Sequence, residues 1–284
     1  MEFLNLVDIG VNLLSPAFDQ DREAVIARAF AAGVQTLIIT GSSIADSVEA
    51  AAFAHNRHAN CITNCVTTAG VHPHNAKDWD ESARQQLWEL VTREPYSDVI
   101  AAIGECGLDY NRNFSPPYAQ RQCFEDQLAL AAQNASKKQR GMPVFLHERD
   151  AFDDFVPILK QYRADLSGVV VHCFTGGMKE LEAYLALDCY IGITGWVCDE
   201  RRGEHLIPLL RHIPADRLLL ETDAPYLLPR NLPRSARGKN SRNEPCFLPH
   251  IAAFAAEILG KTPEQLAAET SANAARLFAV DFPC

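Results

Sequence analysis

Short, continuously apolar runs alternate with longer runs of mixed polarity along the chain. The apolar runs lack the polar alternation of a half-exposed strand, which predicts strands buried on both faces, as in a parallel sheet covered by helices. The predicted strands are residues 3–9, 36–40, 61–69, 99–104, 143–146, 168–171, 190–194 and 217–220. The predicted helices are residues 22–32, 43–55, 81–94, 119–139, 153–162, 179–187, 203–212 and 248–259.

Eight strand–helix units in one chain of 284 residues match the (β/α)8 TIM barrel, an α/β fold. A doubly wound open sheet is the alternative, but the chain has no glycine-rich phosphate loop of either common kind. No change of composition and no linker separates a second domain. The expectation is therefore a single barrel domain over residues 1–284.

The composition narrows the class of protein. The formal net charge is −10, so a polyanionic substrate would have to be held by local positive charge or by a metal ion. No apolar run approaches the roughly 20 residues of a membrane span, and the first residues lack the basic region of a signal peptide. The nine cysteines follow no regular spacing, which fits reduced thiols. We expect a cytoplasmic monomer without an obligate protein partner.

Polar residues stand at the ends of the predicted strands, and in a barrel such ends face one mouth. They are Asp8, Thr40, His72, Glu105, His147, His172 and Asp223. One such histidine alone is more often a core or loop residue. Two imidazoles and two carboxylates together, from Glu105, His147, His172 and Asp223, predict a divalent metal centre that activates water. Asp8 is the weaker candidate, since an acid near a first strand often caps a helix.

A second signal follows the last predicted strand. Residues 224–243 contain no acid but five basic residues, namely Arg230, Arg234, Arg237, Lys239 and Arg242. Beside a metal centre this segment is expected to bind a phosphate backbone through Arg234, Arg237 and Lys239, rather than to be a solvated loop.

Several other side chains past the strand ends have two interpretations. His72 could hold a phosphate oxygen or a leaving group, and His74 is expected on the surface. Arg201 and Arg202 could contact substrate or merely begin a capped helix. Four aromatic residues could stack on bases or pack against loops, namely Tyr110, Phe174, Trp196 and Tyr226.

Five motifs resemble the TatD family of metal-dependent deoxyribonucleases. They are residues 69–74 (AGVHPH), 103–109 (IGECGLD), 142–147 (MPVFLH), 171–176 (VHCFTG) and 221–226 (ETDAPY). The resemblance implies a TIM barrel of the metal-dependent hydrolase superfamily that uses Mg²⁺ (Mn²⁺ or Zn²⁺ being possible) to cut DNA and RNA. It further implies 3′→5′ exonuclease action on single strands and a role in repair of oxidative damage. By position, the family's metal ligands are Glu105, His147 and His172, with Asp223 as a further ligand or water activator.

One departure concerns the number of ions. Where the wider family has two histidines after its first aspartate, this chain has Gly10 and Asn12 after Asp8. We therefore expect one firmly held ion and a weak second ion near Asp8 and Asp223. A tRNA-linked deacylase or small-ester hydrolase on the same barrel is the alternative function. A nucleic-acid-binding scaffold with a decayed metal site is disfavoured, because all four ligand residues are present.

Overall fold

The computed structural model describes residues 4–59, 64–133, 141–237 and 242–279. Within them, a single sheet contains eight strands that are ordered β1 to β8 as in the sequence. The strands are β1 (Leu6–Val11), β2 (Val34–Ile39), β3 (Asn64–Ala69), β4 (Ile100–Asp109), β5 (Val144–Arg149), β6 (Val169–Val171), β7 (Tyr190–Ile193) and β8 (Leu218–Leu220).

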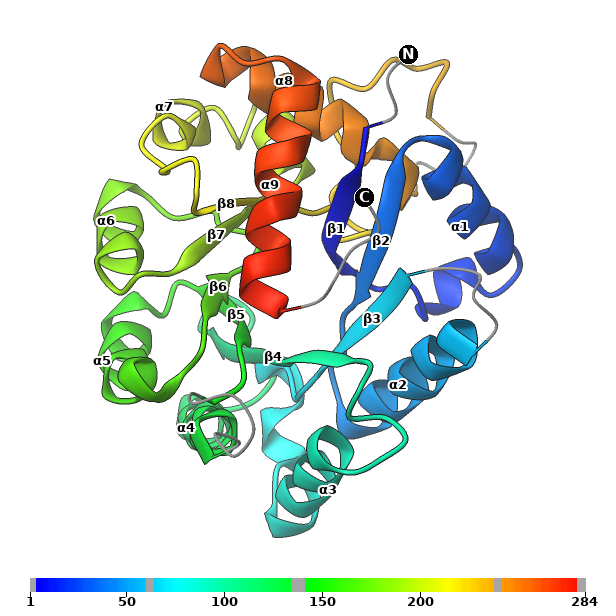
Figure 1. Cartoon of the computed structure of the whole chain (residues 1–284). Coiled ribbons are helices and arrows are strands. Elements are labelled where there is room, and N and C mark those ends of the chain that lie inside the picture. The colour runs from blue at the N-terminus through cyan, green and yellow to red at the C-terminus, as the bar shows by residue number, and fades with distance from the viewer. Residues whose placement is uncertain (1–3, 60–63, 134–140, 238–241, 280–284) are drawn as a thin grey trace. The chain divides into compact units, whose positions relative to one another are not determined.

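A helix or helical turn follows each strand (Figure 1). The α-helices are α1 (Arg22–Ala31), α2 (Ile44–Ala59), α3 (Glu81–Thr92), α4 (Pro117–Gln133), α5 (Phe152–Tyr162), α6 (Met178–Ala186), α7 (Leu206–Leu210), α8 (Leu248–Leu259) and α9 (Pro263–Phe278). Short 3-10 turns are η1 (Pro16–Phe18), η2 (Pro73–Asp78), η3 (Arg163–Asp165), η4 (Gly195–Cys198) and η5 (Pro245–Phe247). None of these helices is long and apolar enough to cross a membrane.

The structure corrects three sequence predictions. Helix α7 is much shorter than residues 203–212, because the preceding residues form turns closed by a 2.7 Å hydrogen bond from the Gly203 amide to the Asp199 carbonyl. Helix α9 was not predicted, although a capping box of Thr262 and Gln265 marks its start. Strand β4 continues to Asp109, five residues beyond its predicted end. The predicted residues 61–63 and the predicted helix end beyond Gln133 lie outside the described residues.

The chain divides into two compact units. One unit consists of Met1–Ile39, Cys173–Leu181 and Ile191–Cys284, and the other of Thr40–His172 and Glu182–Tyr190. In the first unit β1 pairs with β2 and β7 with β8, all parallel. The ends of β1 and β8 also meet, since the Asn12 amide donates to the Ala224 carbonyl and the Asp223 amide to the Gly10 carbonyl, at 2.8 and 2.9 Å. Helix α9 contacts both of these strands (Figure 1).

The second unit holds β3, β4, β5 and β6 as parallel neighbours. Its β4–β5 register contains an irregularity: the partners of Gly104 and Cys106 on β5 are consecutive residues, so Glu105 is an extra residue in β4. Such a bulge redirects a side chain and bends the strand. Gly104 has a φ of 138°, and a Cβ there would lie 2.1 Å from the Phe145 carbonyl oxygen. Only glycine fits this backbone.

Two buried glutamines of α4 fasten the backbone of this unit. The amide group of Gln127 accepts from the Val71 N–H at 2.8 Å and donates to the Val71 carbonyl at 3.0 Å. Seven residues earlier, Gln120 does the same for Asp109, at 2.8 and 3.1 Å. Both side chains are fully buried. Their amide groups therefore supply the hydrogen bonds that water cannot supply to the backbone N–H and C=O of Val71 and Asp109, near the ends of β3 and β4. Val71 precedes His72, so Gln127 also positions that imidazole.

Replacing Gln127 should therefore destabilise the protein strongly. We expect Gln127→Leu to lower the free energy of unfolding by about 2–4 kcal/mol, because the buried N–H and C=O of Val71 lose their partners. Urea unfolding measures the change. Gln122→Leu is the matched control on α4, since Gln122 is exposed and its side chain donates to Asp126 at the surface. Equal effects of the two substitutions would contradict this role for Gln127.

Candidate metal centre

Three imidazoles surround the carboxylate of Glu105. Its Oε1 lies 2.7 Å from Nε2 of His172, 2.9 Å from Nδ1 of His147 and 3.2 Å from Nε2 of His72. Glu105 and His147 belong to β4 and β5, His172 directly follows β6, and His72 comes three residues after β3, as the N-cap of η2. Glu105, His72 and His172 are buried. Four neighbouring strands thus bring four of the predicted site residues together.

Burial and the imidazoles act in opposite directions on Glu105. Removal from water by itself raises the pKa of a carboxyl group. The neighbouring histidines outweigh this effect and hold the pKa of Glu105 well below its usual range, so it is ionised at neutral pH. Burial also lowers the pKa of His72 to about 4, which leaves that ring neutral. A neutral imidazole beside an ionised carboxylate is the protonation state that metal binding requires.

The second ring nitrogen of His147 indicates that a cation fits this centre. His147 Nε2 is buried and has no hydrogen-bond partner among the described residues. It lies 3.7 Å from Oδ2 of Asp109, which is too long for a hydrogen bond. Buried polar atoms rarely stay unpaired. Imidazole nitrogens and a carboxylate are also an ordinary donor set for a divalent transition metal. His72, Glu105 and His147, whose ligand atoms all lie within 4.8 Å of one another, are therefore a group that could hold a metal ion, and His172 contacts the same oxygen of Glu105.

The hydrogen bonds of His72 indicate which of its ring nitrogens carries the proton. Its Nδ1 accepts a hydrogen bond from the backbone N–H of His74 at 3.0 Å. The neutral ring has one lone pair, so its proton lies on Nε2. This N–H faces Oε1 of Glu105, 3.2 Å away, and the possible ligand atoms of His72, Glu105 and His147 all lie within 4.8 Å of one another. His72 is a hydrogen-bond donor aimed at the centre.

Asp109 is a site residue that the sequence reasoning missed. It is 2 % exposed, and its Oδ2 accepts from Nε2 of His74 at 2.7 Å. Its Oδ1 accepts from the backbone N–H groups of Asn111 and Arg112. Although burial raises the pKa of Asp109, these donors and His147 hold it well below its usual range. The sequence does contain a signal for Asp109. Residues four apart on a strand point to the same face, and Asp109 follows Glu105 by four.

The expectation that His74 lies on the surface is wrong. Its side chain is only 30 % exposed and pairs with Asp109. Its ring also lies 4.2 Å from that of His72 and 4.7 Å from that of Phe114, centre to centre. His74 therefore continues the imidazole cluster outward.

Asp8 and Asp223 belong to the other compact unit. Asp8 is fully buried, and its two oxygens accept from the N–H and the hydroxyl of Thr222 at 2.9 and 2.5 Å. Burial raises the pKa of Asp8 to about 8. Asp223 is half-buried, and its Oδ1 accepts from Nδ2 of Asn12 at 2.9 Å. Asp8 thus ties β1 to the segment after β8, and Asn12 orients Asp223.

The basic residues of segment 224–243 differ in their surroundings. Arg242 donates to both oxygens of Asp21 at 2.9 Å and to Glu244 at 2.7 Å, and its guanidinium lies over the ring of Phe18. The guanidinium of Arg237 turns back to the carbonyl oxygens of Leu232 and Arg230. Arg234 is exposed. Lys239 lies outside the described residues.

The four aromatic residues that could stack on bases also differ in their exposure and contacts. Phe174 is 4 % exposed and offers no free face to a base, so the stacking interpretation is wrong for it. The hydroxyl of Tyr110 donates to Asp154 at 2.7 Å. Tyr226 is 58 % exposed, and Trp196 is half-buried beside Arg202.

Eight parallel strands in sequence order, with a carboxylate and imidazoles at neighbouring strand ends, define a TIM-barrel hydrolase of the metal-dependent class. Comparison with known proteins gives the family. The family model of the TatD related DNases matches residues 7–279, and the chain belongs to this family.

Relatives in sequence cover nearly the whole chain. The 3′-5′ ssDNA/RNA exonuclease TatD of Cronobacter sakazakii is 50% identical over 96% of this chain and 97% of its own length. That of Klebsiella pneumoniae is 50% identical over 97% and 98%. Among solved structures, a TatD family hydrolase from Entamoeba histolytica has a TM-score of 0.83 at 26% identity, covering 96% of this chain and 98% of its own. A TatD homologue from Escherichia coli has a TM-score of 0.85 at 25% identity, covering 98% and 100%.

The contacts of Arg242 predict a structural role for this residue. We expect Arg242→Ala to lower the free energy of unfolding by about 1 kcal/mol, near the upper end for a partly exposed ion pair. The hydrogen bond from Arg242 lowers the pKa of Asp21 to about 2, below its ordinary value of 3.8. A lowered carboxyl pKa stabilises the folded state above the ordinary pKa, and this contribution is lost as the pH falls through the folded value.

The difference between wild type and Arg242→Ala should therefore shrink between pH 4 and pH 2. Urea unfolding at several pH values measures it. Arg234→Ala is the control, since Arg234 is an exposed arginine of the same segment. A pH-independent difference would show that the ion pair with Asp21 is not the cause.

Proposed function

We propose that the chain is a divalent-metal-dependent nuclease that removes nucleotides from the 3′ end of single-stranded DNA or RNA. The observation that carries this proposal is the convergence of three imidazole nitrogens within 3.2 Å of one buried oxygen of Glu105. The names of the relatives supply the substrate, and they favour nucleic acid over a small ester or a charged tRNA. The family match includes both compact units, which supports our further proposal that the chain is one hydrolase domain.

Each residue of the centre has a proposed part in hydrolysis. Glu105, His147 and His172 would hold a divalent ion, which when bound activates a water and neutralises charge on the phosphate. Glu105 supplies the negative charge of this ligand set. His72 donates its Nε2–H to a phosphate oxygen, consistent with the lone pair on Nδ1 being engaged by His74. That Asp223, which Asn12 orients, is a further ligand or the water activator stays a prediction of the family resemblance.

The donor set also bears on which ion is bound. Mg²⁺ is the ion that the family resemblance implies, but it prefers oxygen ligands. Imidazole nitrogens suit Mn²⁺ or Zn²⁺ better. We propose that Mn²⁺ binds more tightly than Mg²⁺ and that either ion supports cleavage. The weak second ion near Asp8 stays a prediction, and it would have to share oxygens that already accept from Thr222.

The cytoplasmic, monomeric state also stays a prediction. Seven cysteines of the described residues form no disulfide with one another, namely Cys65, Cys106, Cys123, Cys173, Cys189, Cys198 and Cys246. This supports a reducing compartment.

Removing a ligand should abolish both metal binding and cleavage. We expect wild type to bind one Mn²⁺ tightly in calorimetry, and Glu105→Ala and His147→Ala to lose this site together with cleavage of end-labelled single strands. The loss of rate should exceed about 100-fold, since the ion supplies several kcal/mol of transition-state stabilisation. Circular dichroism checks the fold. The exposed His212 provides the control His212→Ala. Two equally tight ions, or cleavage by either ligand variant, would contradict the assignment.

The exposed arginine of segment 224–243 tests the substrate surface. We propose that Arg234, Arg237 and Lys239 contact the substrate backbone, as the absence of acids in this segment predicts. Arg234→Ala should weaken single-strand binding and lower the salt slope by about 0.7, the value for one phosphate contact on a single strand. Arg242→Ala should leave the slope unchanged, because Asp21 and Glu244 already pair with this residue. The same slope in wild type and Arg234→Ala would exclude this contact.

A further inference from the structure

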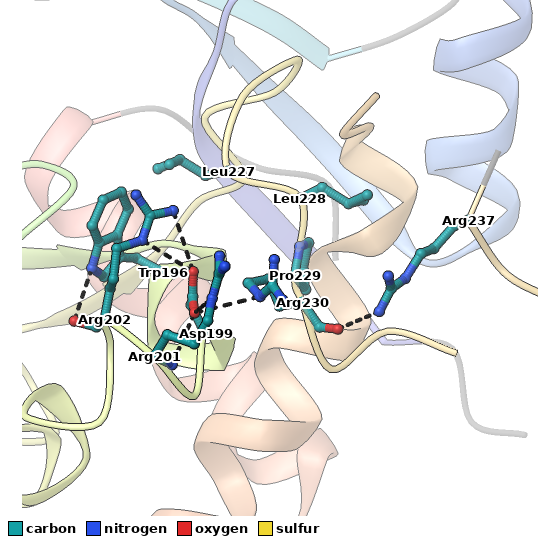
Figure 2. A pocket seen from close by; sticks show the side chains of 10 residues that line it. Trp196, Asp199, Arg201, Arg202, Leu227, Leu228, Pro229, Arg230 and Arg237 are labelled. Atoms are coloured by element: carbon teal, nitrogen blue, oxygen red, sulfur yellow. Dashed lines mark hydrogen bonds and ion pairs between the residues drawn. The ribbon is translucent and has the colours of Figure 1, made fainter. Parts of the chain in front are cut away.

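A pocket of about 330 Å³ lies between the segment after β7 and the segment after β8, within one compact unit (Figure 2). Its volume is at the lower end for ligand pockets, which suits one small group. The residues that matter for its chemistry are Trp196, Asp199, Arg201, Arg202, Arg230 and Arg237. Leu227, Leu228 and Pro229 form an apolar wall (Figure 2).

One buried carboxylate organises the basic side of the pocket. Asp199 is 4 % exposed, and the Nε atoms of Arg201, Arg202 and Arg230 lie 3.3–3.5 Å from its oxygens. The Arg201 amide donates to the same carboxylate at 3.0 Å. Figure 2 shows the three guanidinium groups converging on Asp199. Their positions are therefore set before any ligand arrives, which reduces the entropy lost on binding.

The charge of the cluster is not balanced. Four arginines and one acid, Asp199, line the pocket, and a second acid, Glu200, lies 3.6 Å from Arg230. The difference, four minus two, leaves a surplus of two positive charges on a chain whose net charge is −10. The side chains of Arg201 and Arg202 remain 55% and 59% exposed. A guanidinium has five N–H donors, so donors remain for an anion.

An aromatic surface lies beside this positive charge. The guanidinium of Arg202 lies 4.5 Å from the centre of the Trp196 ring. The indole N–H of Trp196 donates to the Arg202 carbonyl at 3.3 Å, which fixes the ring in place. Indole rings stack on nucleobases of any sequence, and arginine contributes through its flat cation. A phosphate with an attached base matches both halves of the pocket.

We propose that this pocket binds one nucleotide unit, with its phosphate on Arg201, Arg202 and Arg230 and its base against Trp196 and the apolar wall. The unit is either part of a substrate strand or a free mononucleotide. This inference rests on the proposed nuclease function for its ligand class. It assigns a binding site whose chemistry uses guanidinium groups instead of a metal ion, so binding should persist in the presence of a chelator.

The test measures binding by the full chain in EDTA, which also prevents cleavage. The probes are a fluorescein-labelled single-stranded dT 12-mer, followed by anisotropy, and dTMP, followed by calorimetry. The double variant Arg201→Ala/Arg202→Ala should bind at least one of the two probes about tenfold more weakly than wild type. For the 12-mer, the salt slope of binding should fall by about 0.7. Trp196→Ala should weaken binding about tenfold without changing the slope.

The matched control is Arg84→Ala/Arg93→Ala, at α3 and its C-terminal cap, which removes the same charge from one half-buried and one exposed arginine that do not line the pocket. Loss of 12-mer binding alone supports a unit within a strand, and loss of dTMP binding identifies a mononucleotide as ligand. Unchanged binding of both probes, or an equal loss in the control, overturns the proposal. Arg230→Ala, a single change at a partly exposed residue, repeats the test if the double variant misfolds.

These outcomes are independent of cleavage. Cleavage with Mn²⁺ and unchanged binding in the pocket variants would reject the pocket while retaining the proposed function. Binding that is lost in the pocket variants, together with no cleavage by wild type, would support the pocket and reject the proposed nuclease function.

Discussion

The buried charge of Glu105 is the constraint on which the rest of this centre depends. An ionised carboxylate removed from water is costly unless groups of suitable polarity surround it. Here those groups are imidazoles from the segments that carry His72, His147 and His172, so one carboxylate ties four neighbouring strands together. The bulge at Glu105 is part of the same constraint, because an extra residue in β4 is what redirects its side chain.

Around this charge, the neighbouring groups are held by polar contacts that leave little freedom. Gln127 fixes the backbone just before His72, and Gln120 fixes that of Asp109. Hydrogen bonds inside a low-dielectric core rigidify the groups that they join. The hydrogen bond from the His74 amide goes further, since it decides which nitrogen of His72 carries the proton. A backbone contact two residues away thus sets the tautomer of a ring that faces Glu105.

Arginine has two opposite roles in the compact unit that contains β1 and β8. Arg242 and Arg28 pair with two acids, Asp21 and Glu244, so charges match and the group contributes to stability. By contrast, three arginines share Asp199 and keep surplus charge. The same side chain is structural where acids match it and available for anions where they do not. An acidic chain can in this way bind a polyanion without a basic surface overall.

Local pattern was enough to predict the α/β barrel class and to select Glu105, His147 and His172, because buried parallel strands and residues at their ends leave signals within a few neighbouring positions. Helix α9 and Asp109 also had such signals in Thr262–Gln265 and in the four-residue spacing from Glu105. Other features depend on pairs far apart in the chain, such as Asp8 with Thr222 or Arg242 with Asp21. Burial, protonation and the sharing of one carboxylate by several cations are properties of such pairs. Only the tertiary structure decides them, because hydrophobic periodicity reports which face of an element is buried and not which distant group lies against it.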